Sequence, residues 1–160
     1  MSTNLDAVRL TEVLPAGSWR GPAADQVVLD YDGRHRRRMM LTTASGGRYL
    51  LDLPDPVHLR HGDGLRGTDG TIVEVAALAE PLLEVRAATP ADLLRLAWHL
   101  GNRHLAADIQ EGRILIRRDH VIAHMLEHQG ALLAEVTAVF DPEAGAYHGH
   151  GQAHAHGHGH

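Results

Sequence analysis

The 160-residue chain lacks cysteine and lysine, and aromatic residues make up only 4% of it. Without cysteine, disulfide bonds and thiolate metal sites are excluded. Without lysine, a catalytic or Schiff-base lysine is excluded. No apolar run approaches the roughly 18 residues of a membrane span, and residues 1–10 lack the basic and then apolar order of a signal peptide. We therefore expect a cytoplasmic protein that does not use a membrane as its partner.

Charge is also scarce on the positive side. Fifteen arginines face 20 acidic residues, so the net charge is −5 with histidine neutral, and this balance argues against nucleic acid as a partner. Arginines cluster around His35, at positions 34, 36, 37 and 38. On a strand, Arg36 and Arg38 face one way and Arg37 the other, so they do not form a single patch. A protein contact or a solvated edge strand is the favoured interpretation.

The first half of the chain has the pattern of a small all-β domain, which we place at residues 1–76. Turn-forming stretches such as Tyr31-Asp32-Gly33 separate short runs of strand-forming residues, and no segment shows a helical period. The expected strands are Arg9–Leu14, Gln26–Tyr31, Arg37–Leu41, Arg48–Leu53 and Thr71–Ala76.

The second half, residues 77–146, predicts the order βαββαβ. A strand around Leu82 and Val85 precedes a helix that Thr89 caps, and Gly101 is placed to end that helix in a left-handed conformation. The remaining expected elements are a hairpin of Ala107–Gln110 and Arg113–Ile116, a helix between Asp119 and Gly130, and a strand at Leu132–Phe140. This order is the ferredoxin-like arrangement, so the fold class is α+β.

Histidine is the one residue type in clear excess, with 14 copies. Six lie in residues 147–160, where they alternate with glycine and alanine and leave nothing large to bury, so we expect a disordered tail. An affinity tag is the alternative, but tags are normally uninterrupted histidine runs. The tail histidines are His148, His150, His154, His156, His158 and His160.

Four further histidines are candidate metal ligands, because neutral imidazole is the commonest protein ligand. His104 follows the first expected helix in an exposed loop. His120, His124 and His128 recur every four residues and drift only about 80° around the second helix, beside its apolar face. A solvated helix face explains this stripe equally simply, although pairs four residues apart can chelate one ion.

The ligand type indicates a transition metal without selecting one. Imidazole without thiolate suits Ni²⁺, Cu²⁺ and Zn²⁺. No His-Glu-x-x-His motif, phosphate loop, nucleophile elbow or dinucleotide fingerprint occurs, and no acid, base and nucleophile constellation can be assembled. A carrier that exchanges metal fits this pattern better than an enzyme.

Several runs resemble the urease accessory metallochaperone family UreE, in order along nearly the whole chain. The most specific is Gly101-Asn102-Arg103-His104, and the run from Phe140 to Tyr147 before the histidine-rich tail is nearly as telling. Further similar runs are Tyr31-Asp32-Gly33-Arg34-His35-Arg36-Arg37-Arg38, Tyr49-Leu50-Leu51-Asp52-Leu53-Pro54 and Asp119-His120-Val121.

The resemblance implies an N-terminal β domain for protein contacts, a ferredoxin-like domain that binds metal and forms a homodimer, and delivery of nickel to the urease apoprotein complex with an accessory GTPase. His104 matches the family's central nickel ligand, shared across the dimer. His120 matches a further histidine of some members, whereas Arg118 stands where those members have another. His99 has counterparts that are not essential ligands.

Three functions therefore remain in view. The first is a nickel carrier that uses His104, with His120 and the tail as auxiliaries and with Zn²⁺ or Cu²⁺ competing. The second is a histidine-based buffer or storage protein for zinc, copper or nickel. The third is an interaction module whose histidines are incidental.

Overall fold

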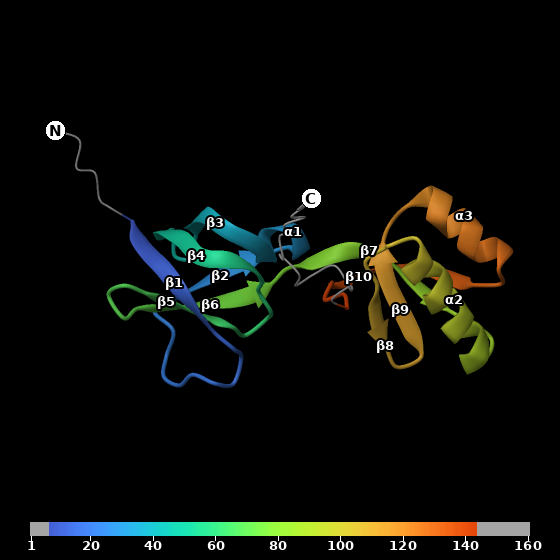
Figure 1. The fold of residues 1–160 in the computed structure, drawn as a ribbon, viewed down its shortest axis with the longest axis horizontal. Helices are drawn as coiled ribbons and strands as arrows, with labels where there is room; N and C mark the ends of the chain where they lie inside the picture. Colours follow the sequence, from blue (N-terminus) through green and yellow to red (C-terminus); the bar gives the residue numbers. More distant parts are fainter. Residues whose placement is uncertain (1–6, 144–160) are drawn as a thin grey trace, which may run out of the picture. The chain divides into compact units, whose positions relative to one another are not determined.

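The computed structural model describes residues 7–143, which divide into two compact units. One unit contains residues 7–82 together with 135–141, and the other contains 83–134 together with 142–143. Figure 1 labels their elements. Among the described residues, no helix has the length and apolarity that crossing a membrane requires.

The first unit is built on a curled six-stranded sheet with the strand order β2-β6-β5-β1-β4-β3 (Figure 1). Strand β1 is parallel to β4, and β2 is parallel to β6, while the β3–β4, β1–β5 and β5–β6 pairs are antiparallel. The strands are β1 (Val8–Leu14), β2 (Asp25–Leu29), β3 (His35–Thr42), β4 (Arg48–His58), β5 (Gly64–Gly67) and β6 (Ile72–Ala77).

All five strands expected in this half are present, but two further elements were missed. Strand β5 has only four residues, two of them glycine, so it carries little strand pattern. The segment expected as a turn at Tyr31 forms the single-turn helix α1 (Tyr31–Arg34), whose cap Asp30 accepts a hydrogen bond from Gly33 N at 2.7 Å. The expectation that this half contains no helix was therefore wrong, because it contains one single-turn helix.

Leucine and valine from every part of this sheet form one core, which includes fully buried Leu10, Leu51 and Val75. Strand β3 lies at the edge of the sheet, and Arg36, Arg37 and Arg38 on it are exposed, as the solvated edge strand predicts.

The second unit has the order βαββαβ, and its four-stranded sheet has the order β10-β7-β9-β8. This confirms the ferredoxin-like expectation and the α+β class. Its elements are β7 (Ala79–Arg86), α2 (Pro90–Asn102), β8 (Asp108–Gln110), β9 (Arg113–Arg117), α3 (His120–His128) and β10 (Leu132–Val139). The start of β7 and the end of β10 belong to the first unit. Strands β8 and β9 form the expected antiparallel hairpin, with Gly112 at a φ of 74°.

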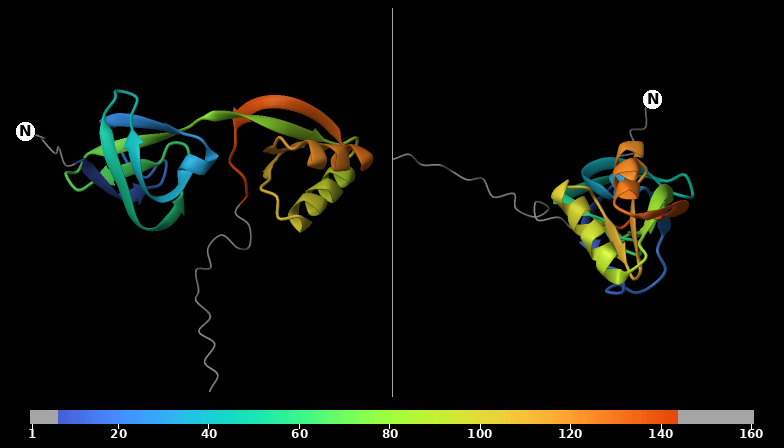
Figure 2. Two further views of the ribbon diagram at one scale, coloured as in Figure 1. Left: turned by 90° about the horizontal axis from the view of Figure 1, so that it is seen from above. Right: turned by 90° about the vertical axis from the view of Figure 1, so that its right-hand side faces the viewer.

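Both helices pack on one face of this sheet (Figure 2). Ile114 and Ile116 of β9 point to the same side because their spacing is two, and they join Leu96 and Leu100 of α2 and Leu126 of α3 in one cluster. Burying these side chains is the main stabilisation of short helices such as α3. The opposite face of each helix is exposed. On α3 it carries the histidines, and on α2 it includes the apolar side chains of Leu94 and Trp98.

Candidate metal centre

His104 lies in the tight turn that follows α2, and its side chain is exposed. Its φ is 56°, which makes it the single non-glycine residue with positive φ in the described part of the chain. This left-handed conformation costs an ordinary residue roughly 1–2 kcal/mol. Strained backbone of this kind is concentrated at functional sites.

The hydrogen bonds of the turn define a Schellman motif that is centred on His104. The N–H of His104 donates to the carbonyl of Gly101 at 3.0 Å, and the N–H of Leu105 donates to the carbonyl of Leu100 at 3.2 Å. Leu105 also packs against the core of the unit. The turn is therefore anchored at both its backbone and its apolar side chain, and it holds the Cα–Cβ bond of His104 in one direction.

The expectation that Gly101 takes the left-handed position was wrong. Helix α2 runs through Gly101 to Asn102, and Arg103 is the cap residue. Glycine is the preferred residue at such a position, but the packing of Leu100 and Leu105 places the helix end three residues later. Histidine therefore occupies a position where glycine is usual.

His120 is the first residue of α3 and is exposed. The preceding Asp119 caps the helix as expected, because its carboxylate accepts hydrogen bonds from Val121 N at 2.9 Å and Ile122 N at 3.1 Å. Arg118 is exposed just before this cap. The cap therefore fixes where α3 starts and where His120 lies on it.

The other expected ligands fall into two groups. His124 and His128 lie on the exposed face of α3, and their Nε2 atoms are 3.1 Å apart. The six tail histidines lie outside the described residues. Among residues 7–143, the structure brings no three His, Cys, Asp or Glu side chains together in a group that could hold a metal ion.

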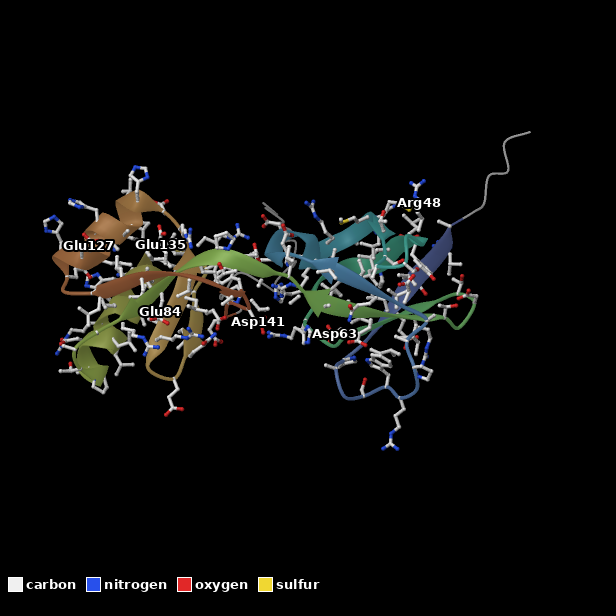
Figure 3. The ribbon with its side chains drawn as sticks, turned by 180° about the vertical axis from the view of Figure 1, so that it is seen from behind. Arg48, Asp63, Glu84, Glu127, Glu135 and Asp141 are labelled. Carbon is white, nitrogen blue, oxygen red and sulfur yellow. The ribbon has the colours of Figure 1, made fainter. Side chains whose placement is uncertain are left out.

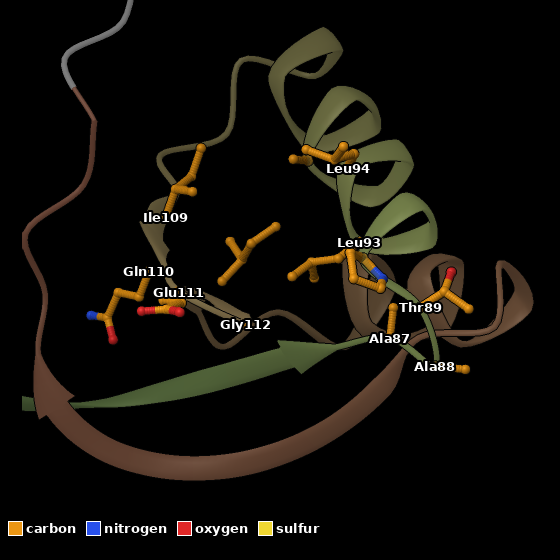
Figure 4. A pocket seen from close by; sticks show the side chains of 12 residues that line it. Ala87, Ala88, Thr89, Leu93, Leu94, Ile109, Gln110, Glu111 and Gly112 are labelled. Carbon is orange, nitrogen blue, oxygen red and sulfur yellow. The ribbon is translucent and has the colours of Figure 1, made fainter.

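A pocket of about 550 Å³ opens between α2 and the β8–β9 hairpin (Figure 4). Leu93 and Leu94 of the helix line one side, and Ile109 and Gln110 of the hairpin line the other. None of the expected ligands lines it. Its lining is mainly apolar, so it is unsuited to hold a hydrated cation.

An ion-pair network joins strands β7 and β9 of the second sheet. Glu84 of β7, labelled in Figure 3, accepts hydrogen bonds from Arg86 at 2.8 Å and from Arg113 at 2.9 Å. These two guanidinium groups, Arg86 first, lower the pKa of the Glu84 carboxyl. The carboxylate is therefore occupied by arginine and is not a free metal ligand.

Sequence reasoning missed a polar cluster in the first unit. Arg34 belongs to the arginine cluster that was interpreted as a protein contact or a solvated edge strand, but it is fully buried. Its guanidinium donates hydrogen bonds to the carbonyls of Leu59 and Phe140. Nearby, His58 Nε2 lies 3.4 Å from the carboxylate of Asp141, which is labelled in Figure 3. Burial lowers the pKa of His58, and the hydrogen bond with Asp141 only partly opposes this effect. No local pattern marks these residues, because their partners are 25 to 106 positions away.

Comparison with known proteins agrees with this architecture. Residues 10–78 match the family model described as UreE urease accessory protein, N-terminal domain, and residues 80–160 match that of the C-terminal domain.

Three relatives named urease accessory protein UreE show the degree of similarity. The protein of Bradyrhizobium sp. strain ORS 278 is 53% identical over 140 residues, which is 88% of this chain and 67% of the relative. That of Chelativorans sp. strain BNC1 is 57% identical over 125 residues, 78% of this chain and 79% of the relative. That of Rhizobium rhizogenes strain K84 is 49% identical over 140 residues, which is 88% of this chain and 84% of the relative.

These matches cover both units and confirm the resemblance drawn from the sequence. Members of the family are accessory chaperone proteins and not catalytic enzymes. The chain belongs to the UreE family of urease accessory proteins.

Proposed function

We propose that this protein is a nickel-binding metallochaperone that donates Ni²⁺ during assembly of the urease metal centre. The observation that carries the proposal is His104, an exposed imidazole held on a strained and hydrogen-bonded turn at the end of α2. A rigid turn presents one ligand without enclosing the ion. The ion is therefore held in a defined place and is still able to leave.

The proposal assigns a role to each part of the chain. Residues 1–76 contact protein partners, the urease apoprotein complex and its accessory GTPase. Residues 77–146 bind metal and form a homodimer in which His104 of each chain contributes to one site. Residues 147–160 capture nickel through their six histidines, and His120 assists. We place this activity in the cytoplasm, with Zn²⁺ or Cu²⁺ as competitors for the same imidazoles.

A symmetric dimer supports this arrangement chemically. One imidazole is a poor site, but a two-fold axis near His104 doubles every ligand. Tail imidazoles tethered to the same chain reach an effective concentration in the mM range, which is typical of short flexible linkers. Four or more nitrogen ligands are then available to one ion.

The test is activation of apo-urease at limiting nickel by the full chain and by His104→Ala. We expect activation to collapse in the variant, while total metal binding, carried mostly by the tail, falls only modestly. Replacing His124 should do far less. Normal activation by His104→Ala together with failure of His124→Ala would assign delivery to α3 and overturn the role of His104.

The competing function is a histidine-based buffer or storage protein for zinc, copper or nickel. The sequence feature that favours it is the abundance of tail histidines, which suits capacity more than selectivity. Loading the chain with nickel and adding apo-urease separates the two functions. A carrier loses its nickel to urease, whereas a buffer retains it.

A further inference from the structure

His124 and His128 form a close pair on the exposed face of α3. The residues are one helical turn apart, and their ring centroids lie 4.6 Å from each other with the ring planes nearly perpendicular, at 88°. Their Nε2 atoms are 3.1 Å apart. Both side chains reach solvent, so an ion can approach the two nitrogens without displacing the core.

The separation of the two nitrogens suits a shared metal ion. Metal–imidazole bonds are about 2.0–2.1 Å long for zinc. Two nitrogens 3.1 Å apart therefore subtend an angle of about 95–102° at an ion bound to both. This angle lies between the right angle of octahedral or square-planar ligands and the tetrahedral angle. Each Nε2 must turn about 40° away from the line between the two nitrogens to point at the ion, which rotation of the exposed side chains allows.

We propose that His124 and His128 form a two-imidazole site for a divalent ion of the nickel, copper and zinc class, separate from the site of His104. Both Nε2 atoms bind the ion, the Nδ1 atoms carry the ring protons, and water completes the coordination shell. Imidazole nitrogen without thiolate or a carboxylate cluster selects this class of metal over calcium and magnesium.

The helix backbone preorganises the two imidazoles for chelation. Leu126 between the two histidines is fully buried in the core, which fixes the rotation of α3 and keeps both imidazoles on the outer face. The main cost of binding is the loss of side-chain freedom, which the imidazole contact already limits. Two ligands with water elsewhere give a site that exchanges its ion readily.

In the metal-free protein, a hydrogen bond between the rings accounts for the same distance. One Nε2–H donates and the other Nε2 accepts. Metal binding moves this proton from Nε2 to Nδ1 of the same ring, so both rings stay neutral and no net proton is released. The proposal thus predicts a change of tautomer in one ring.

The site does not depend on nickel donation, and the experiment isolates it within the full-length chain. The starting protein carries alanine at the six tail histidines, His104→Ala and His120→Gln. Its binding of Zn²⁺ and Ni²⁺ is measured by native mass spectrometry and calorimetry. We expect one ion per chain, and either His124→Gln or His128→Gln should weaken binding about tenfold or more, because each leaves a single imidazole.

The double variant should lose the residual binding of a single imidazole as well, and this second loss should be smaller than the first because the chelate is already lost. His99→Gln on α2 is the matched control and should leave binding unchanged. Equal losses in His99→Gln, or unchanged binding in both single variants, would overturn the proposal.

A second measurement uses the unmodified chain. Nitrogen NMR of the imidazole rings should show His124 and His128 changing together on addition of Zn²⁺, with both Nδ1 atoms protonated. Rings that keep one Nε2–H at saturating Zn²⁺ would contradict the site even if the variants failed to fold.

Discussion

His104 ends α2 with the same backbone conformation and the same pair of hydrogen bonds with which Gly130 ends α3. The φ angles are 56° and 84°. At the end of α3, the N–H groups of Gly130 and Ala131 donate to the carbonyls of Glu127 and Leu126 at 3.0 Å each. The N–H groups of His104 and Leu105 make the corresponding two hydrogen bonds at the end of α2. One helix therefore ends on the residue that this motif prefers, and the other ends on an imidazole.

This relationship predicts that His104→Gly stabilises the protein while it removes the ligand. Glycine relieves the left-handed strain, and the gain exceeds its greater entropy in the unfolded chain, for a net rise of about 1 kcal/mol in the free energy of unfolding. His104→Ala keeps the strain and should unfold near the wild-type midpoint. Denaturant unfolding of the three metal-free proteins measures this difference. Destabilisation by His104→Gly would show that contacts of the imidazole stabilise the fold by more than the left-handed backbone destabilises it.

Metal binding should weaken steeply as the pH falls from about 7 to 5, because every ligand must be unprotonated and imidazole titrates near 6.5. Nickel titrations at fixed ionic strength measure the change. Carboxylate-dominated binding would persist to lower pH. Unchanged nickel affinity at pH 5 would therefore rule out histidine as the main ligand.

The pKa of His58 should shift in opposite directions when its neighbours Asp141 and Arg60 are replaced. Burial lowers the pKa of His58, the hydrogen bond with Asp141 raises it, and the charge of Arg60 lowers it. Asp141→Asn should therefore lower the pKa of His58 further, and Arg60→Gln should raise it. Imidazole proton NMR of the two variants provides the measurement, and shifts of equal sign would contradict the assignment.

The same pKa sets a pH dependence of stability. Because the folded state disfavours protonated His58, its contribution is complete above about pH 6.5, the unfolded value, and is lost as the pH falls through the lower folded value. The unfolding midpoint should therefore decline more steeply below pH 6.5 in the wild type than in His58→Gln. A parallel decline would show that His58 contributes nothing to it.

Arg34 should be far more sensitive to substitution than its neighbours. Its side chain is completely buried and donates to two carbonyls, of Leu59 and Phe140, which lysine cannot reach in the same forked geometry. We expect Arg34→Lys to lower the free energy of unfolding by about 1–3 kcal/mol. Arg36→Lys on the exposed edge strand is the control and should change it by less than about 0.5 kcal/mol. Equal effects would show that burial of Arg34 is unimportant.

The sequence by itself determined the elements whose signals are local. Thr89 and Asp119 mark the starts of α2 and α3 because their side chains accept hydrogen bonds from amides two or three residues away. Glu111-Gly112 marks the turn of the β8–β9 hairpin, because the turn signal lies in the two residues that join the strands. The ferredoxin-like order follows once these elements are placed, and the candidate ligand His104 was visible as the residue after a helix.

Tertiary structure alone decided the features that depend on distant partners. Packing of Leu100 and Leu105 in the core carries α2 past Gly101 and puts His104 into the left-handed position. Leu59 and Phe140 draw Arg34 into the interior, although its place in a cluster of four arginines suggested a protein contact or a solvated edge strand. Likewise, the spacing of His124 and His128 allowed either a solvated stripe or a pair. The buried side of α3 sets its rotation, and the local side-chain arrangement brings the two nitrogens within 3.1 Å.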